Sequence, residues 1–135
     1  MACKSGAIFD GYRRHVLDSF GLLNTPHPPV PSLTLILRKR NGEKNVGRIL
    51  ANEQEIVQYL ESINLSKLKV VDTAKMTFRE QLTVMRSTSI LIGIHGAGLM
   101  HSMFTADEAI LVEIHPSYRM DRHFRHASKL AGKVN

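Results

Sequence analysis

The sequence predicts an α/β domain with a doubly wound, Rossmann-like parallel sheet. Four short segments are apolar at consecutive positions, and helical patterns of apolar residues lie between them. Strands that are apolar on both faces are typical of a parallel sheet covered by helices on each side, and the helices supply the crossover connections. A length of 135 residues fits one such domain.

Residues 1–31 are predicted to form an amphipathic helix and a linker. Apolar side chains recur about every 3.6 positions over residues 9–20, and Gly21 follows as a residue that can end a helix. Residues 24–31 contain four of the five prolines of the chain, which disfavour both a helix and a sheet interior. We therefore place a domain boundary here and assign residues 32–135 to the Rossmann-like domain.

The first half of this domain is predicted as strand, helix, strand and helix. Residues 33–37 and 68–71 form the two strands. The helix between them begins at Asn52, whose side chain can cap it while Glu55 reaches back. Thr77 and Glu80 have the spacing of a capping box, which begins the next helix.

The second half repeats this order. Residues 89–94 and 109–114 are the third and fourth strands, and residues 97–104 form a short helix between them. Residues 121–130 are predicted to be the last helix, with Phe124, Ala127 and Leu130 facing the core.

The chain has a net charge of +6, from 18 Lys and Arg residues against 12 Asp and Glu residues. This excess favours an anionic partner, for which phosphate-bearing small molecules, nucleic acids and acidic surfaces all qualify. The single cysteine, Cys3, excludes an internal disulfide and a cysteine-based zinc site. Since no apolar run is long enough to span a bilayer or to form a secretory signal, we expect a soluble chain without a targeting signal.

The glycine-rich segment GIHGAGL lies where the third strand is predicted to become a helix. Ligands of open α/β sheets bind beyond the carboxyl ends of the strands, and the N–H groups of a helix N-terminus suit a phosphate or diphosphate. We expect His95 to donate from its ring to such an anion, and the next four residues to donate from the backbone. These four are Gly96, Ala97, Gly98 and Leu99. The alternative is a tight turn around a packed imidazole, because the segment matches neither common phosphate-binding glycine motif.

Two arginines, Arg38 and Arg48, border the loop that follows the first strand. A guanidinium keeps its charge and presents a fixed fork of donors, so the pair can clamp a diphosphate. The alternative is a solvated basic loop, since residues 38–40 also resemble a surface charge run.

Glu113 is a carboxylate within the apolar fourth strand, where burial without a donor is costly. An acid at the end of such a strand often accepts hydrogen bonds from ribose hydroxyls, which makes Glu113 a candidate nucleoside contact. A structural donor, such as a backbone amide or an arginine, would explain the residue as well.

Four histidines near the end of the chain raise the question of a metal site: His101, His115, His123 and His126. His123 and His126 share a face of the predicted helix, but the sequence shows no obvious third ligand and no Asp-x-Asp pair. We therefore interpret these histidines as surface residues and expect neither a metal ion nor a tightly bound cofactor.

Several motifs occur together in a fixed order. They are Arg38, RIL at residues 48–50, NEQE at 52–55, EQL at 80–82, IGIHGAGL at 92–99 and VEI at 112–114. In this combination the sequence resembles the family 61 glycosyltransferases over about residues 33–133. The resemblance implies an inverting transferase of GT-B type with two Rossmann-like lobes, of which the C-terminal lobe binds a UDP-sugar. The chain would then belong to the C-terminal lobe, would be incomplete at its end, and would lack its N-terminal lobe.

The resemblance also implies roles for residues and partners. Arg38 and Arg48 would grip the diphosphate, the turn at residues 95–99 would donate to it, and Glu113 would lie near the nucleoside. The implied donor sugar is N-acetylglucosamine, the acceptor is a hydroxyl of a glycoprotein or glycan, and the compartment is the endoplasmic reticulum or the Golgi. The catalytic base is expected outside this chain, and no nucleic-acid partner is expected.

Two other functions stay open at this point. A basic Rossmann-like module could bind nucleic acid or another phosphate ligand through residues 38–40 and Lys44, with an affinity that falls steeply with salt. That loop lacks the interleaved aromatic residues that would support nucleic-acid binding. A truncated, inactive transferase is the other alternative.

Overall fold

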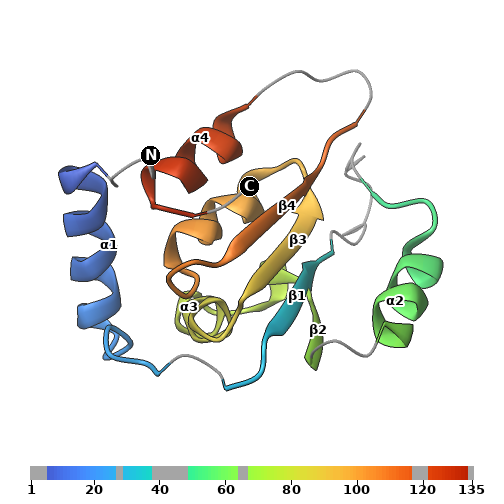
Figure 1. Ribbon diagram of the computed structural model, residues 1–135, viewed down its shortest axis with the longest axis horizontal. Helices are drawn as coiled ribbons and strands as arrows, with labels where there is room; N and C mark the ends of the chain where they lie inside the picture. The colour runs from blue at the N-terminus through green and yellow to red at the C-terminus, as the bar shows by residue number, and fades with distance from the viewer. Residues whose placement is uncertain (1–5, 27–28, 38–48, 64–66, 117–121, 134–135) are drawn as a thin grey trace.

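The computed structural model describes residues 6–26, 29–37, 49–63, 67–116 and 122–133. Four parallel strands form one sheet in the order β2-β1-β3-β4 (Figure 1). The strands are β1 (Ser32–Ile36), β2 (Lys67–Val71), β3 (Ile90–Ile94) and β4 (Ile110–Ile114). The α-helices are α1 (Ala7–Ser19), α2 (Glu53–Ser62), α3 (Phe78–Arg86) and α4 (His123–Leu130), and the 3₁₀ helices are η1 (Thr73–Lys75) and η2 (Ala97–Phe104). The predicted α/β fold with a parallel, Rossmann-like sheet is confirmed.

The strand register brings the carboxyl ends of three strands to one edge of the sheet. Ile36 of β1 pairs with Gly93 of β3, and Gly93 pairs with Glu113 of β4. The segments that follow these three strands therefore leave the sheet next to one another. This edge is where the predicted ligand-binding residues should meet.

The main hydrophobic core lies on one side of the sheet, under α1, α3, α4 and η2 (Figure 1). Leu91 of β3 and Leu111 of β4 point into this core and meet Leu82 and Met85 of α3. α1 contributes to the same core, because Leu17 is fully buried in it. The predicted division of the chain after residue 31 stays a prediction.

α1 ends in the way that the sequence predicts. Gly21 has a φ of +68°, a left-handed conformation that glycine adopts at little cost. The Leu22 N–H then donates to the Leu17 carbonyl oxygen at 2.8 Å, which closes the last turn. No described helix has both the length and the hydrophobicity needed to cross a membrane.

The opposite face of the sheet is less covered than the sequence predicts. Val70, Ile110 and Val112 are 43%, 41% and 42% exposed, respectively. Among the described residues, α2 is the helix on this side, next to β2, and it has no fully buried residue (Figure 1). The expectation of helices on both faces is therefore met only in part within the described chain.

Of three further helix details that the sequence predicts, one is confirmed and two are wrong. The capping box of α3 is confirmed: Thr77 Oγ1 accepts a hydrogen bond from the Glu80 N–H, and a Glu80 carboxylate oxygen accepts one from the Thr77 N–H at 2.7 Å. The Asn52 side chain does not cap α2, because its amide donates instead to the Glu55 carboxylate at 3.4 Å. Leu130 does not face the core, because it is 47% exposed in the last turn of α4.

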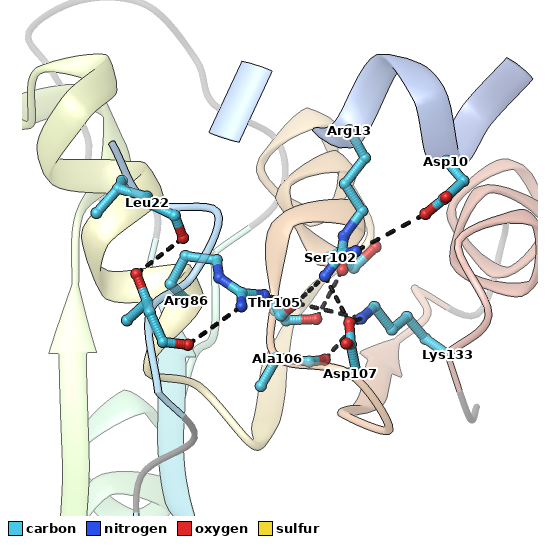
Figure 2. Close-up of polar contacts among 10 residues, drawn as sticks. Asp10, Arg13, Leu22, Arg86, Ser102, Thr105, Ala106, Asp107 and Lys133 are labelled. Carbon is cyan, nitrogen blue, oxygen red and sulfur yellow. Dashed lines mark hydrogen bonds and ion pairs between the residues drawn. The ribbon is translucent and has the colours of Figure 1, made fainter. Parts of the chain in front are cut away.

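Three buried cations gather around the loop that joins η2 to β4 (Figure 2). Arg13 of α1, Arg86 of α3 and Lys133 after α4 donate to the carbonyl oxygen of Thr105, at 3.3, 3.1 and 3.1 Å, respectively. Asp107 supplies a carboxylate oxygen that lies 2.6 Å from an Arg13 nitrogen and 3.7 Å from Lys133 Nζ. This cation cluster joins segments from both ends and from the middle of the chain to one loop.

Candidate functional site

The glycine-rich segment forms a turn from β3 into η2. A Cβ atom at Gly93 would lie 2.9 Å from Leu99 Cδ2, so the absence of a side chain lets η2 pack closely on β3. η2 begins after Gly96, whose carbonyl oxygen accepts a hydrogen bond from the Leu99 N–H at 2.9 Å. The N–H groups of Ala97 and Gly98 come before this bond, so they have no partner within the helix. They are donors available to a ligand at this edge of the sheet.

His95 and Glu113 form a buried pair at the carboxyl ends of β3 and β4. Glu113 Oε1 lies 2.6 Å from His95 Nδ1, and the two side chains are 3% and 9% exposed. The second carboxylate oxygen, Oε2, lies 3.2 Å from Nε2 of His115. One carboxylate therefore links two imidazoles. We call these three side chains the His-Glu-His cluster.

The surrounding fold holds His95 in this position. Its N–H donates to the Ile114 carbonyl oxygen at 2.9 Å, which ties the turn to β4. Its ring contacts the rings of His115 and Phe124, each at a centroid distance of 4.9 Å. The imidazole is thus directed at Glu113 and shielded from solvent, which leaves it little freedom to rotate.

The sequence left open whether Glu113 contacts a nucleoside or a donor within the fold, and the structure answers part of this question. Among the described residues, the Glu113 carboxylate has structural partners that are imidazoles rather than a backbone amide or an arginine. A contact between Glu113 and a nucleoside stays a prediction. The structure supports a role in holding His95, and with it the turn into η2.

His115 is the member of the cluster that sequence reasoning misses, since the pattern marks it as a surface histidine. A signal for it exists in the sequence. Ile94 and Ile114 pair across β3 and β4, and each is followed directly by a histidine. Once the two strands are taken as neighbours in parallel register, both imidazoles must leave the sheet at the same place.

Arg38 and Arg48 lie outside the described residues, so their place beside a diphosphate stays a prediction. The chain is described up to Leu37, which follows β1 and donates its N–H to the Val71 carbonyl oxygen at 2.9 Å. β1 is the neighbour of β3, so Leu37 leaves the sheet at the same edge as the glycine-rich turn.

The remaining candidate histidines lie apart from the His-Glu-His cluster. His101 Nδ1 is 3.0 Å from the Gly98 carbonyl oxygen, and its ring contacts Phe78 at a centroid distance of 6.3 Å. His123 and His126 are exposed on α4. These two therefore agree with their interpretation as surface residues.

We expect Gly93→Ala to lower the free energy of unfolding by about 1–3 kcal/mol, because the added methyl group overpacks a buried site. Leu99 is 1% exposed, so its side chain cannot turn away without displacing its own neighbours. Urea denaturation of the purified chain measures the change.

Gly11→Ala is the matched control for this prediction. Gly11 lies in α1, and an added Cβ atom there would meet nothing within 4 Å. Alanine is also the better helix former, so this variant should gain up to about 1 kcal/mol of stability. Equal, small changes for the two variants would contradict the close packing of η2 on β3.

The sequence profile of the family described as Glycosyltransferase 61 matches residues 5–112. The chain is 32% identical over 118 residues to the EGF domain-specific O-linked N-acetylglucosamine transferase of Xenopus laevis. It is 29% identical to the proteins of the same name from Gallus gallus, over 116 residues, and Drosophila melanogaster, over 114 residues. Each match covers 84% of this chain and 21% of the relative, so the chain spans about a fifth of the length of these relatives.

Proposed function

This chain belongs to the glycosyltransferase 61 family, and on that premise we propose that it is the donor-binding part of an inverting glycosyltransferase. The whole enzyme would transfer a sugar from a UDP-sugar to a hydroxyl group of a protein or glycan. The relatives are named as N-acetylglucosamine transferases, so we propose N-acetylglucosamine as the donor sugar.

The observation that carries this proposal is the turn at the carboxyl end of β3. Ala97 and Gly98 present N–H groups that η2 does not use, at the edge where α/β sheets bind their ligands. Backbone donors at the start of a helix suit the oxygens of a diphosphate. The buried contact between His95 and Glu113 keeps the turn in the conformation that presents them.

Positive charge would complete the diphosphate site. Arg38 and Arg48 border the loop that begins at the neighbouring strand, and they would neutralise the charge that develops on the departing UDP. An inverting transfer also needs a base that takes the proton of the acceptor hydroxyl. We place that base, and the acceptor site, in a second lobe outside this chain. Action on secreted proteins would place the enzyme in the endoplasmic reticulum or the Golgi.

Calorimetric titration of the chain with UDP tests the proposal. We expect weak binding by the wild type and a loss of at least about tenfold in affinity in Arg38→Ala, which corresponds to about 1.4 kcal/mol. Arg40→Ala is the matched control, because it removes the same charge from the same loop without altering the residue at the end of the strand. No binding by the wild type at millimolar UDP, or equal losses in both variants, would count against the site. The chain alone should transfer no sugar.

A further inference from the structure

Three potential metal ligands meet where β3 and β4 end. One ring nitrogen from each of His95 and His115 and one carboxylate oxygen of Glu113 all lie within 4.8 Å of one another. Two imidazoles and one carboxylate form a common donor set for zinc and other first-row transition metals. This set differs from the all-oxygen sites that calcium and magnesium prefer.

Two contacts within the cluster have separations near those of a coordination shell, and the three ligand atoms together lie within 4.8 Å. Ligand atoms bound at about 2.0–2.1 Å in a tetrahedral site lie roughly 3.3 Å apart. Glu113 Oε2 and His115 Nε2 are 3.2 Å apart, whereas Glu113 Oε1 and His95 Nδ1 are 2.6 Å apart, at hydrogen-bonding distance. The two contacts use different oxygens of Glu113, so a metal ion would bind after side-chain rotations that bring one ligand atom of each residue to about 3.3 Å from the others.

Two members of the His-Glu-His cluster are held in place by the fold, and the third can be reached from solvent. His95 and Glu113 are buried, and the hydrogen bond from the His95 N–H to Ile114 fixes their backbones relative to each other. The His115 side chain is 35% exposed, which gives an ion a way in from solvent. Three protein ligands leave at least one coordination position for water or an anion.

We propose that His95, Glu113 and His115 bind one divalent transition-metal ion with the ligand preferences of zinc. The proposal stands on the geometry of these three side chains and does not depend on nucleotide binding. It also differs from the expectation drawn from the sequence, where no third ligand was evident, because the ligands converge only when β3 and β4 pair in register.

Calorimetric titration of the full chain with Zn²⁺ tests this site. The protein carries Cys3→Ser and no histidine tag, so that neither a thiol nor a tag competes for the ion. We expect one Zn²⁺ per chain and no comparable binding of Mg²⁺. Co²⁺ should bind in the same place and give the visible absorption bands of a site with nitrogen and oxygen ligands.

Two sets of variants locate the ion. His115→Ala should weaken Zn²⁺ binding at least about tenfold. The matched control, His123→Ala with His126→Ala, removes two exposed histidines from α4 and should bind Zn²⁺ as the wild type does. Far-UV circular dichroism checks that each variant folds, and His115→Asn replaces His115→Ala if that variant does not.

Three outcomes would overturn the proposal: no Zn²⁺ binding by the wild type, binding that survives the loss of His115, or binding that disappears with His123 and His126. UDP titrations on the same proteins without metal keep this test separate from the proposed function. A chain that binds UDP but not Zn²⁺ would overturn the metal site alone.

Discussion

Leu99→Ala should lower the free energy of unfolding of the chain by about 2–5 kcal/mol. Leu99 belongs to the glycine-rich segment, but its side chain is 1% exposed and packs in the core with Ile36 and Leu91. The substitution removes buried methyl groups and leaves a cavity that the packed strands can close only in part. Urea denaturation followed by circular dichroism measures the loss.

Met100→Ala is the matched control, because Met100 follows Leu99 in η2 and is 37% exposed. We expect it to lose less than about 1 kcal/mol. A second check uses the contact between Gly93 and Leu99: Gly93→Ala should cost less in the Leu99→Ala background than in the wild type, by about 0.5 kcal/mol or more. Strictly additive losses would contradict that contact, and equal losses in Leu99→Ala and Met100→Ala would contradict the buried position of Leu99.

The order of the elements could be predicted because the signals for it are local. The predicted strands at residues 89–94 and 109–114 differ from β3 and β4 by one residue at one end. The capping box at Thr77 and Glu80 depends on residues three apart, and the end of α1 depends on the conformation of Gly21 alone. The order of the strands within the sheet is known from the structure and not from these local signals.

The predictions that failed concern the burial or the hydrogen bonding of a side chain, because both depend on the neighbours that the side chain meets in the folded chain. The period of α4 places Leu130 on the same face as Ala127, but its last turn extends beyond the core. Val112 lies on the edge strand β4 and is 42% exposed, whereas Leu35, two strands away in the same row, is fully buried. Asn52 shows a third reason: an amide can donate as well as accept, and a nearby Glu55 favours donation.

The candidate site also combines residues that the sequence identifies with contacts that it cannot predict. His95 and Glu113 can each be selected from the sequence, one beside glycines and the other within an apolar strand. Their contact cannot, because they are 18 positions apart and meet only through the register of β3 and β4. Arg38 and Arg48 are still known from the sequence alone, since they lie outside the described residues.

The cation cluster has no sequence signal at all. Arg13 and Thr105 are 92 positions apart, and nothing local to either residue indicates that they meet. Figure 2 shows two carboxylates, Asp10 and Asp107, beside the three buried cations of this cluster, so positive charge is in excess there. Burial, together with the nearby charge of Arg13, lowers the pKa of Lys133 from 10.5 to about 8.

This shift makes the stability of the chain depend on pH in the alkaline range. Below about pH 8, Lys133 is charged in both states, and the folded chain bears the cost of burying that charge. Between about pH 8 and the ordinary lysine pKa of 10.5, the unfolded chain keeps a proton that the folded chain has lost. The contribution of Lys133 to stability should therefore rise with pH, by up to about 1.4 kcal/mol per pH unit.

Lys133→Met should remove this rise. Lys129→Met is the matched control, because Lys129 is an exposed residue of α4 and its variant should keep the pH dependence of the wild type. Denaturation from about pH 7 to about pH 10 gives the free energy of unfolding of all three proteins, and the other alkaline groups cancel when they are compared. Relative to Lys133→Met, the wild type and Lys129→Met should both gain stability as the pH increases. Parallel curves for all three would show that the buried amine does not titrate within the folded cation cluster.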